Sequence, residues 1–438
     1  MIARLRKFLS DLGETFWVLP GLMVVCGILA AVGSVHLDRS GVVPHWLIAS
    51  PWLYNGGATG ARTLLGAVAS STIGVAGTVF SITIAALSLA AGQMGPRLLR
   101  NFTRDRGNQF TLGTFLGTFS FALMVLRSVR THSEGEFVPH LSLTLSIAFA
   151  FVSVGTLVFF VGHMAGRINV DTVIELVSQE VKAGIRRLTG NAPQPEMPSA
   201  AIWDGAELVR DPRQGYVQQL HGDGLATWAA EKGTAIRLLV RPGDYVFPGA
   251  AIALIIPPVD GADAAIRDAT ALGAQRVSSA DLEFAVRQLV EVAVRALSPG
   301  INDPHTAMSV LDRLGGALCE LKGRHLNSGV FHRRDRPVLV VPAVTYDGLC
   351  DGMFNLIRQN AAGSVAVLIR LLEVLISVAG CETVPQRLDT LQRHAALVLD
   401  DAMRSVTNPA DLDDLKQRHR AFAAMRRFGP AGPPAAET

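Results

Sequence analysis

Residues 64–92 read LLGAVASSTIGVAGTVFSITIAALSLAAG and contain no charged side chain. A helix needs about 20 mostly apolar residues to cross the hydrocarbon core of a bilayer, and this stretch exceeds that length. Seven small residues recur in it at steps of three or four, which places them on one helical face: Ser70, Gly74, Gly77, Ser81, Ala85, Ser88 and Gly92. The stretch predicts a membrane-spanning helix with one face that lacks bulk, called here the small-residue face.

Three further stretches without Asp, Glu, Lys or Arg, residues 16–37, 109–126 and 141–162, complete a predicted four-span transmembrane domain over residues 1–165. The composition agrees, because 49% of the chain is hydrophobic and only 18% is charged, against about 25% in globular chains. Residues 365–378 are also apolar, but Arg370 and Glu373 lie in their middle. Each charge at a helix centre costs roughly 2.5–3.5 kcal/mol on insertion scales, so we expect a buried helix there and not a fifth span.

Basic residues predict the orientation of the spans. Arg4, Arg6 and Lys7 precede the first span, and the loop between the second and third carries four arginines against one acid. Loops rich in Lys and Arg stay in the cytoplasm. The N-terminus is therefore expected in the cytoplasm, and four crossings return the remainder of the chain, with the C-terminus, to the same side.

The C-terminal part is expected to be an α+β region. A connecting helix and linker over 166–200 precede a small β-barrel-like module over 201–258, a helical cytoplasmic domain over 259–428 and a disordered tail over 429–438. The turn Val240–Gly249 is similar to the turn of barrel-sandwich hybrid domains of the biotinyl and lipoyl type, but no lysine occupies the hairpin that such carriers modify. A carrier role is thus not expected, and no cofactor is predicted.

Three groups of residues are candidate sites. The small-residue face is either a helix-packing surface or the lining of a polar path for an ion or small solute. In the loop after it, Arg97, Arg100 and Arg104 would share one face of a short helix and contact anionic lipid, or would attract anions to a vestibule in a ring of subunits. The third group gathers polar side chains at a predicted helix N-terminus, as an anion, ligand or partner site or simply a capped turn: Asn302, Asp303, His305 and Thr306.

Three motifs resemble a known family. Residues 78–107, Val138–Ser142 and Arg295–Pro304 together resemble a bacterial family of predicted membrane proteins, the domain of unknown function 2254. The resemblance covers nearly the whole chain. It implies a transmembrane N-terminal half and a place in the bacterial inner membrane, and it supplies no activity, cofactor or catalytic residue.

Three functions follow as hypotheses. The first is a homo-oligomeric channel or permease-like protein with the second span near the central axis and a regulatory cytoplasmic domain. The second is a non-conducting sensor or scaffold that binds a cytoplasmic protein partner. The third, a membrane enzyme, is disfavoured because no P-loop, GxSxG or HExxH motif occurs. The four cysteines and the histidines show no metal-ligand spacing, and a net charge of +3 does not suggest nucleic acid as a partner; membrane lipids are the expected surroundings.

Overall fold

The computed structural model describes residues 16–40, 56–94, 105–130, 137–276 and 282–429. The chain forms two compact units, which divide between Asn169 and Val170. The first unit corresponds to the predicted transmembrane domain over 1–165, and the second contains the predicted connecting, β-rich and helical regions.

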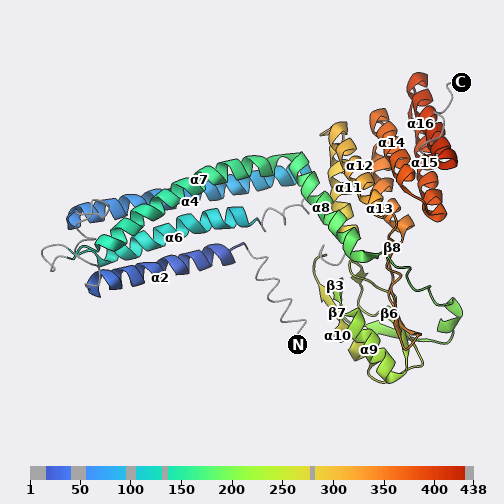
Figure 1. Ribbon diagram of the computed structural model, residues 1–438, viewed down its shortest axis with the longest axis horizontal. Helices are drawn as coiled ribbons and strands as arrows, with labels where there is room; N and C mark the ends of the chain where they lie inside the picture. Colours follow the sequence, from blue (N-terminus) through green and yellow to red (C-terminus); the bar gives the residue numbers. More distant parts are fainter. Residues whose placement is uncertain (1–15, 41–55, 95–104, 131–136, 277–281, 430–438) are drawn as a thin grey trace. The chain divides into compact units, whose positions relative to one another are not determined.

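Four long helices, which lie side by side in Figure 1, make up the first unit: α2 (Val18–Ser40), α4 (Ala58–Met94), α6 (Arg106–Ser128) and α7 (His140–Ile168). By length and composition, four helices among the described residues are able to cross a membrane, and they are these four. The prediction of four long apolar helices is therefore confirmed, and each helix continues beyond at least one predicted end. The apolar stretch 365–378 lies in α14 (Val365–Cys381) of the second unit, where one side of the helix is buried.

Helix α6 is the centre of the first unit. In its most apolar window 61% of the residues are buried, against 22% in each of the other three helices. Its glycines admit α2 closely: a Cβ atom on Gly27 of α2 would lie 2.5 Å from the carbonyl oxygen of Gly117. Gly113, one turn before Gly117, faces Met23 and Pro20 of α2 in the same way. Small residues let helix backbones approach in lipid, and here they join α2 to α6.

Two carboxylates hold the ends of these helices. Asp38 on α2 accepts hydrogen bonds from the backbone N–H groups of Leu141 and Ser142, both at 3.0 Å, and from the Ser142 hydroxyl at 2.7 Å. It thereby satisfies free N–H groups in the first turn of α7. Asp105 caps α6 by accepting from Gly107 N–H at 2.8 Å, and its other oxygen lies 2.7 Å from Nε2 of His163 on α7.

The second unit begins with the amphipathic helix α8 (Val170–Leu188), which lies in the predicted connecting segment. The strands are, in chain order, β1 (Thr189–Gly190), β2 (Glu207–Asp211), β3 (Gly215–Leu220), β4 (Ala235–Leu238), β5 (Tyr245–Val246), β6 (Ala250–Ile256), β7 (Thr270–Gly273), β8 (His325–Leu326), β9 (Val330–Arg333) and β10 (Arg336–Val340). Helices α9 (Gly222–Lys232) and α10 (Ala262–Ala269) contribute Leu225 and Ile266 to the core beneath the sheets.

The prediction of a β-barrel-like module is wrong, because the described strands form open sheets. Their orders are β2-β6-β4-β10-β9, β5-β3-β7 and β1-β8. Strand β10, outside the predicted module, pairs in parallel with β4 and sets Leu339 opposite Ile236. In a barrel formed by the predicted module alone, β4 would pair on this side with another strand of the module. Here β10, about 100 residues later in the chain, takes that place. Strands β7 to β10 also fall in the segment 259–428, which was predicted as helical.

The remaining helices lie within the segment 259–428. They are α11 (Leu282–Ala296), α12 (Pro304–Cys319), α13 (Tyr346–Asn360), α14 (Val365–Cys381), α15 (Pro385–Ser405) and α16 (Pro409–Phe428). Proline stands in the first turn of α12, α15 and α16, where its missing N–H and fixed φ cost nothing. Helix α14 contacts both α12 and α16, and Leu314, Leu371 and Leu415 of these three helices are fully or almost fully buried.

The contact of α2 with α6 is open to test by added bulk. Replacement of Gly27 by isoleucine should lower the free energy of unfolding by about 1–3 kcal/mol, the usual cost of overpacking, because the new side chain meets the α6 backbone. Gly33→Ile on the same helix is the control, since nothing lies within 4 Å of a Cβ atom there. Thermal unfolding in detergent measures both variants, and an equal loss in the two would contradict this packing.

Candidate functional site

The small-residue face of α4 is not covered by the other described helices of the first unit. All seven of its members, from Ser70 to Gly92, are exposed. At Gly74, Gly77 and Gly92 an added Cβ atom would meet nothing within 4 Å. The face is therefore open along about six helical turns, the distance that these seven residues cover at 3.6 residues per turn.

The opposite face of α4 carries the contacts within the subunit. Ala61, Leu65, Ala69, Ala76 and Val79 are buried there. They belong to two apolar clusters, to which α6 and α7 contribute Phe121, Val125, Leu143, Leu112, Phe115 and Phe160. The two sets of small residues thus differ in their surroundings. Gly113 and Gly117 of α6 pack against α2, whereas the small-residue face of α4 is exposed.

The hydroxyl groups of the α4 face are partly satisfied by the helix itself. Ser81 donates to the carbonyl oxygen of Gly77 at 2.9 Å, and Thr78, beside the face, donates to that of Gly74 at 3.2 Å. Such bonds lower the cost of placing a hydroxyl in a membrane, since no water is available to it there. The face is therefore compatible with packing in lipid, and its hydroxyl oxygens remain acceptors.

The other two predicted groups differ in what the structure says of them. Arg97, Arg100 and Arg104 lie outside the described residues. Asn302, Asp303, His305 and Thr306 do lie together at the N-terminus of α12. Asp303 accepts from Thr306 N–H at 3.1 Å and from the Thr306 hydroxyl at 2.6 Å, and the hydrogen bond of that hydroxyl holds the pKa of the Asp303 carboxyl below its ordinary value.

This turn is well formed without a ligand. Asn302 adopts φ 50°, a left-handed conformation that Asn tolerates better than most residues. The backbone N–H of Asn302 donates to Ser298 and that of Asp303 to Ala296, at 2.9 and 2.8 Å. His305 is exposed. These bonds account for the residue types as a capped connection, and a ligand or partner at this turn stays a prediction.

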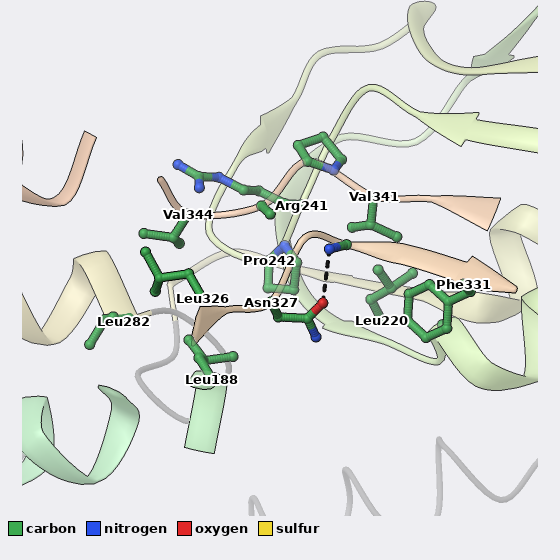
Figure 2. Close-up of a pocket in the computed structure, with 14 residues that line it drawn as sticks. Leu188, Leu220, Arg241, Pro242, Leu282, Leu326, Asn327, Phe331, Val341 and Val344 are labelled. Atoms are coloured by element: carbon green, nitrogen blue, oxygen red, sulfur yellow. Dashed lines mark hydrogen bonds between the residues drawn. The ribbon is translucent and has the colours of Figure 1, made fainter. Parts of the chain in front are cut away.

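A pocket in the second unit was not predicted from the sequence. It has a volume of about 210 Å³ and is lined by the end of α8, the end of β3, the turn after β4, the start of α11, and the chain around β8, β9 and the segment after β10. Figure 2 shows Leu326, Val344 and Leu188 toward one end, Leu220 and Phe331 toward the other, and Asn327 between them. Asn327 accepts from Gly329 N–H at 2.8 Å. The lining comes from six separate stretches of chain, so no local motif marks it.

Comparison with protein-family models identifies the chain. The model described as predicted membrane protein (DUF2254) matches residues 13–377. The chain belongs to the DUF2254 family. An uncharacterized protein of Mycobacterium tuberculosis (strain CDC 1551 / Oshkosh) is 31% identical over 451 residues, which cover 99% of this chain and 85% of the relative. An uncharacterized protein of Mycobacterium bovis is similar to the same extent. The search of solved structures found no match for this DUF2254 chain.

The cap of α12 supports a test with a defined pH dependence. Asp303→Ala should destabilise the first turn by about 1 kcal/mol, and Asp303→Asn should cost less because its amide oxygen still accepts a hydrogen bond. Since the folded pKa of Asp303 is lowered, its contribution is complete above the ordinary carboxyl pKa of about 3.9. It is lost as the pH falls through the lower folded value. Hydrogen exchange at the start of α12 in the full chain measures these effects, and unchanged exchange in Asp303→Ala would refute the cap.

Proposed function

We propose that the protein is a homo-oligomer of the bacterial inner membrane, assembled through the small-residue face of α4, and that the assembly provides a path for an ion or small solute. Both termini lie in the cytoplasm in this proposal, where the second unit regulates the assembly. No catalysis is assigned to it. The observation that carries the proposal is the exposure of all seven members of the α4 face.

The free face supports assembly on energetic grounds. Helices associate in lipid by close van der Waals packing and interhelical hydrogen bonds, and small residues at steps of four are the usual contact. The α2–α6 contact at Gly27 and Gly117 is an instance within this chain. A second copy of α4 meets the same condition at Gly74 and Gly77, where no atom of the chain's own described part is near.

The filled interior of the first unit supports a path between subunits and not through one. Phe115, Phe121 and Phe160 are almost fully buried among the helices, and Phe121 packs edge-on against Phe149 with 4.9 Å between ring centroids. Ser70, Ser81 and Ser88 of α4, by contrast, are exposed on its outer side. An oligomer with α4 at its axis would therefore present the polar atoms of Ser70, Ser81 and Ser88 to the path.

The second candidate function is a non-conducting sensor or scaffold. The hydrogen bond from Ser81 to the Gly77 carbonyl favours it, because a hydroxyl satisfied within its own helix can lie in a dry packing surface and needs no water-filled path. Both candidates require the oligomer, and they differ in whether the purified assembly conducts.

Cysteine cross-linking tests the assembly. With Cys26 replaced by serine, Gly77→Cys should form covalent dimers in membranes under oxidation, because Gly77 lies on the open face. Ala76→Cys is the matched control, since Ala76 is 2% exposed and packed inside the subunit. The native thiols of the second unit set the background. Equal cross-linking at positions 76 and 77, or none at 77, would refute assembly through this face.

Flux measurements separate the two candidates. Liposomes containing the purified oligomer should pass at least one of K⁺, Na⁺, Cl⁻ or H⁺, and Ser81→Ala should reduce the flux severalfold because a hydroxyl is removed without added bulk. Ile82→Leu, on the same helix but outside the small-residue face, is the control for general effects. An oligomer that cross-links at position 77 and passes none of the four ions would exclude conduction of them and leave the sensor or scaffold.

A further inference from the structure

We propose that the pocket of the second unit binds a small amphipathic anion, with a short apolar body and one carboxylate-like group. The site lies wholly within the second unit, so the inference does not depend on assembly through α4 or on conduction. It gives the second unit a ligand of stated chemistry.

The size and lining of the pocket define the body of the ligand. About 210 Å³ is below the roughly 300–1,000 Å³ of pockets that hold drug-sized molecules, so a short chain or a small ring is the right scale. Leucine, valine, proline, alanine and phenylalanine supply most of the wall. Leu282 and Val341 are buried in that wall, and burial of apolar ligand surface against them gives roughly 25 cal/mol per Å².

The charge of the lining defines the head of the ligand. Arg241 is the one charged residue among the 14 that line the pocket, and no acid is among them. Figure 2 shows its guanidinium on the Val344 side. Among the described residues the guanidinium donates to Glu283 at 2.5 Å. A guanidinium has five N–H donors in a planar fork suited to carboxylates, so donors remain for a second anion.

The ion pair of Arg241 and Glu283 is partly exposed, so another anion can exchange with the Glu283 carboxylate. The side chains of Arg241 and Glu283 are 23% and 19% exposed. Glu283 lies on α11, next to the lining residue Leu282, and Arg241 lies in the turn after β4. A bound anion would share Arg241 with the Glu283 carboxylate or displace that carboxylate from it.

Leu188, the last residue of α8, lines the same pocket, and α8 follows the last candidate span after a single residue, Asn169. A ligand in the pocket would therefore contact the end of α8, the helix that follows the last candidate span.

Titration calorimetry of the full chain in lipid nanodiscs tests the site, with hexanoate as the probe and empty nanodiscs as the blank. Hexanol and hexylammonium carry the same chain with a neutral and a cationic head. Hexanoate should bind more tightly than hexanol, and hexylammonium should not bind. Ala343→Phe, which fills the pocket, should abolish hexanoate binding.

Two variants of the ion pair give opposite expectations. Arg241→Gln should weaken hexanoate binding about ten- to a hundredfold, as expected for loss of a charge-assisted hydrogen bond. Glu283→Gln removes the competing carboxylate and should tighten it. A purely structural pair would make both variants weaken binding alike. That result, equal binding of hexanoate and hexanol, or hexanoate binding that survives Ala343→Phe would overturn the proposal. Unliganded melting temperatures confirm that each variant is folded.

Discussion

The backbones of α2 and α6 approach so closely at Gly27 and Gly117 that a single methyl group at Gly27 would fall 2.5 Å from a carbonyl oxygen. In lipid this kind of approach replaces the hydrophobic driving force that packs helices in water. It makes α6 the buried centre of the first unit and lets α4 and α7 close around its other sides. The small residues of α2 and α6 thus pack within the subunit, whereas those on the small-residue face of α4 are exposed.

Carboxylates at the helix ends complete the first unit. Asp38 supplies to α7 the cap that Pro139, at the N-cap position, does not provide by its side chain. Asp105 caps its own helix and also reaches His163 on α7. Both acids lie at or beyond the ends of the predicted spans, where a charge costs far less than at a helix centre. The contacts that these two carboxylates make between helices are therefore kept out of the apolar middle.

Much of this arrangement was predictable from local pattern. The four apolar stretches, the amphipathic α8, and Asp303 with Pro304 before α12 act through neighbouring residues, and the structure confirms the elements that they predict. The pairing of β4 with β10 joins residues about 100 positions apart, so the local turn pattern of Val240–Gly249 pointed to a barrel that does not form. The pocket around Arg241 likewise draws on six stretches of chain. The small-residue face was recognised from its spacing, but only the buried opposite face shows which stripe is free.

The central claim is that α4 faces another copy of itself. Particle images of the protein in lipid nanodiscs test it most directly, because they show both the number of subunits and the helix nearest the symmetry axis. The account predicts two or more subunits with Gly74, Gly77 and Ser81 of neighbouring copies in contact or around a common axis. A single chain with lipid against these three residues would contradict it.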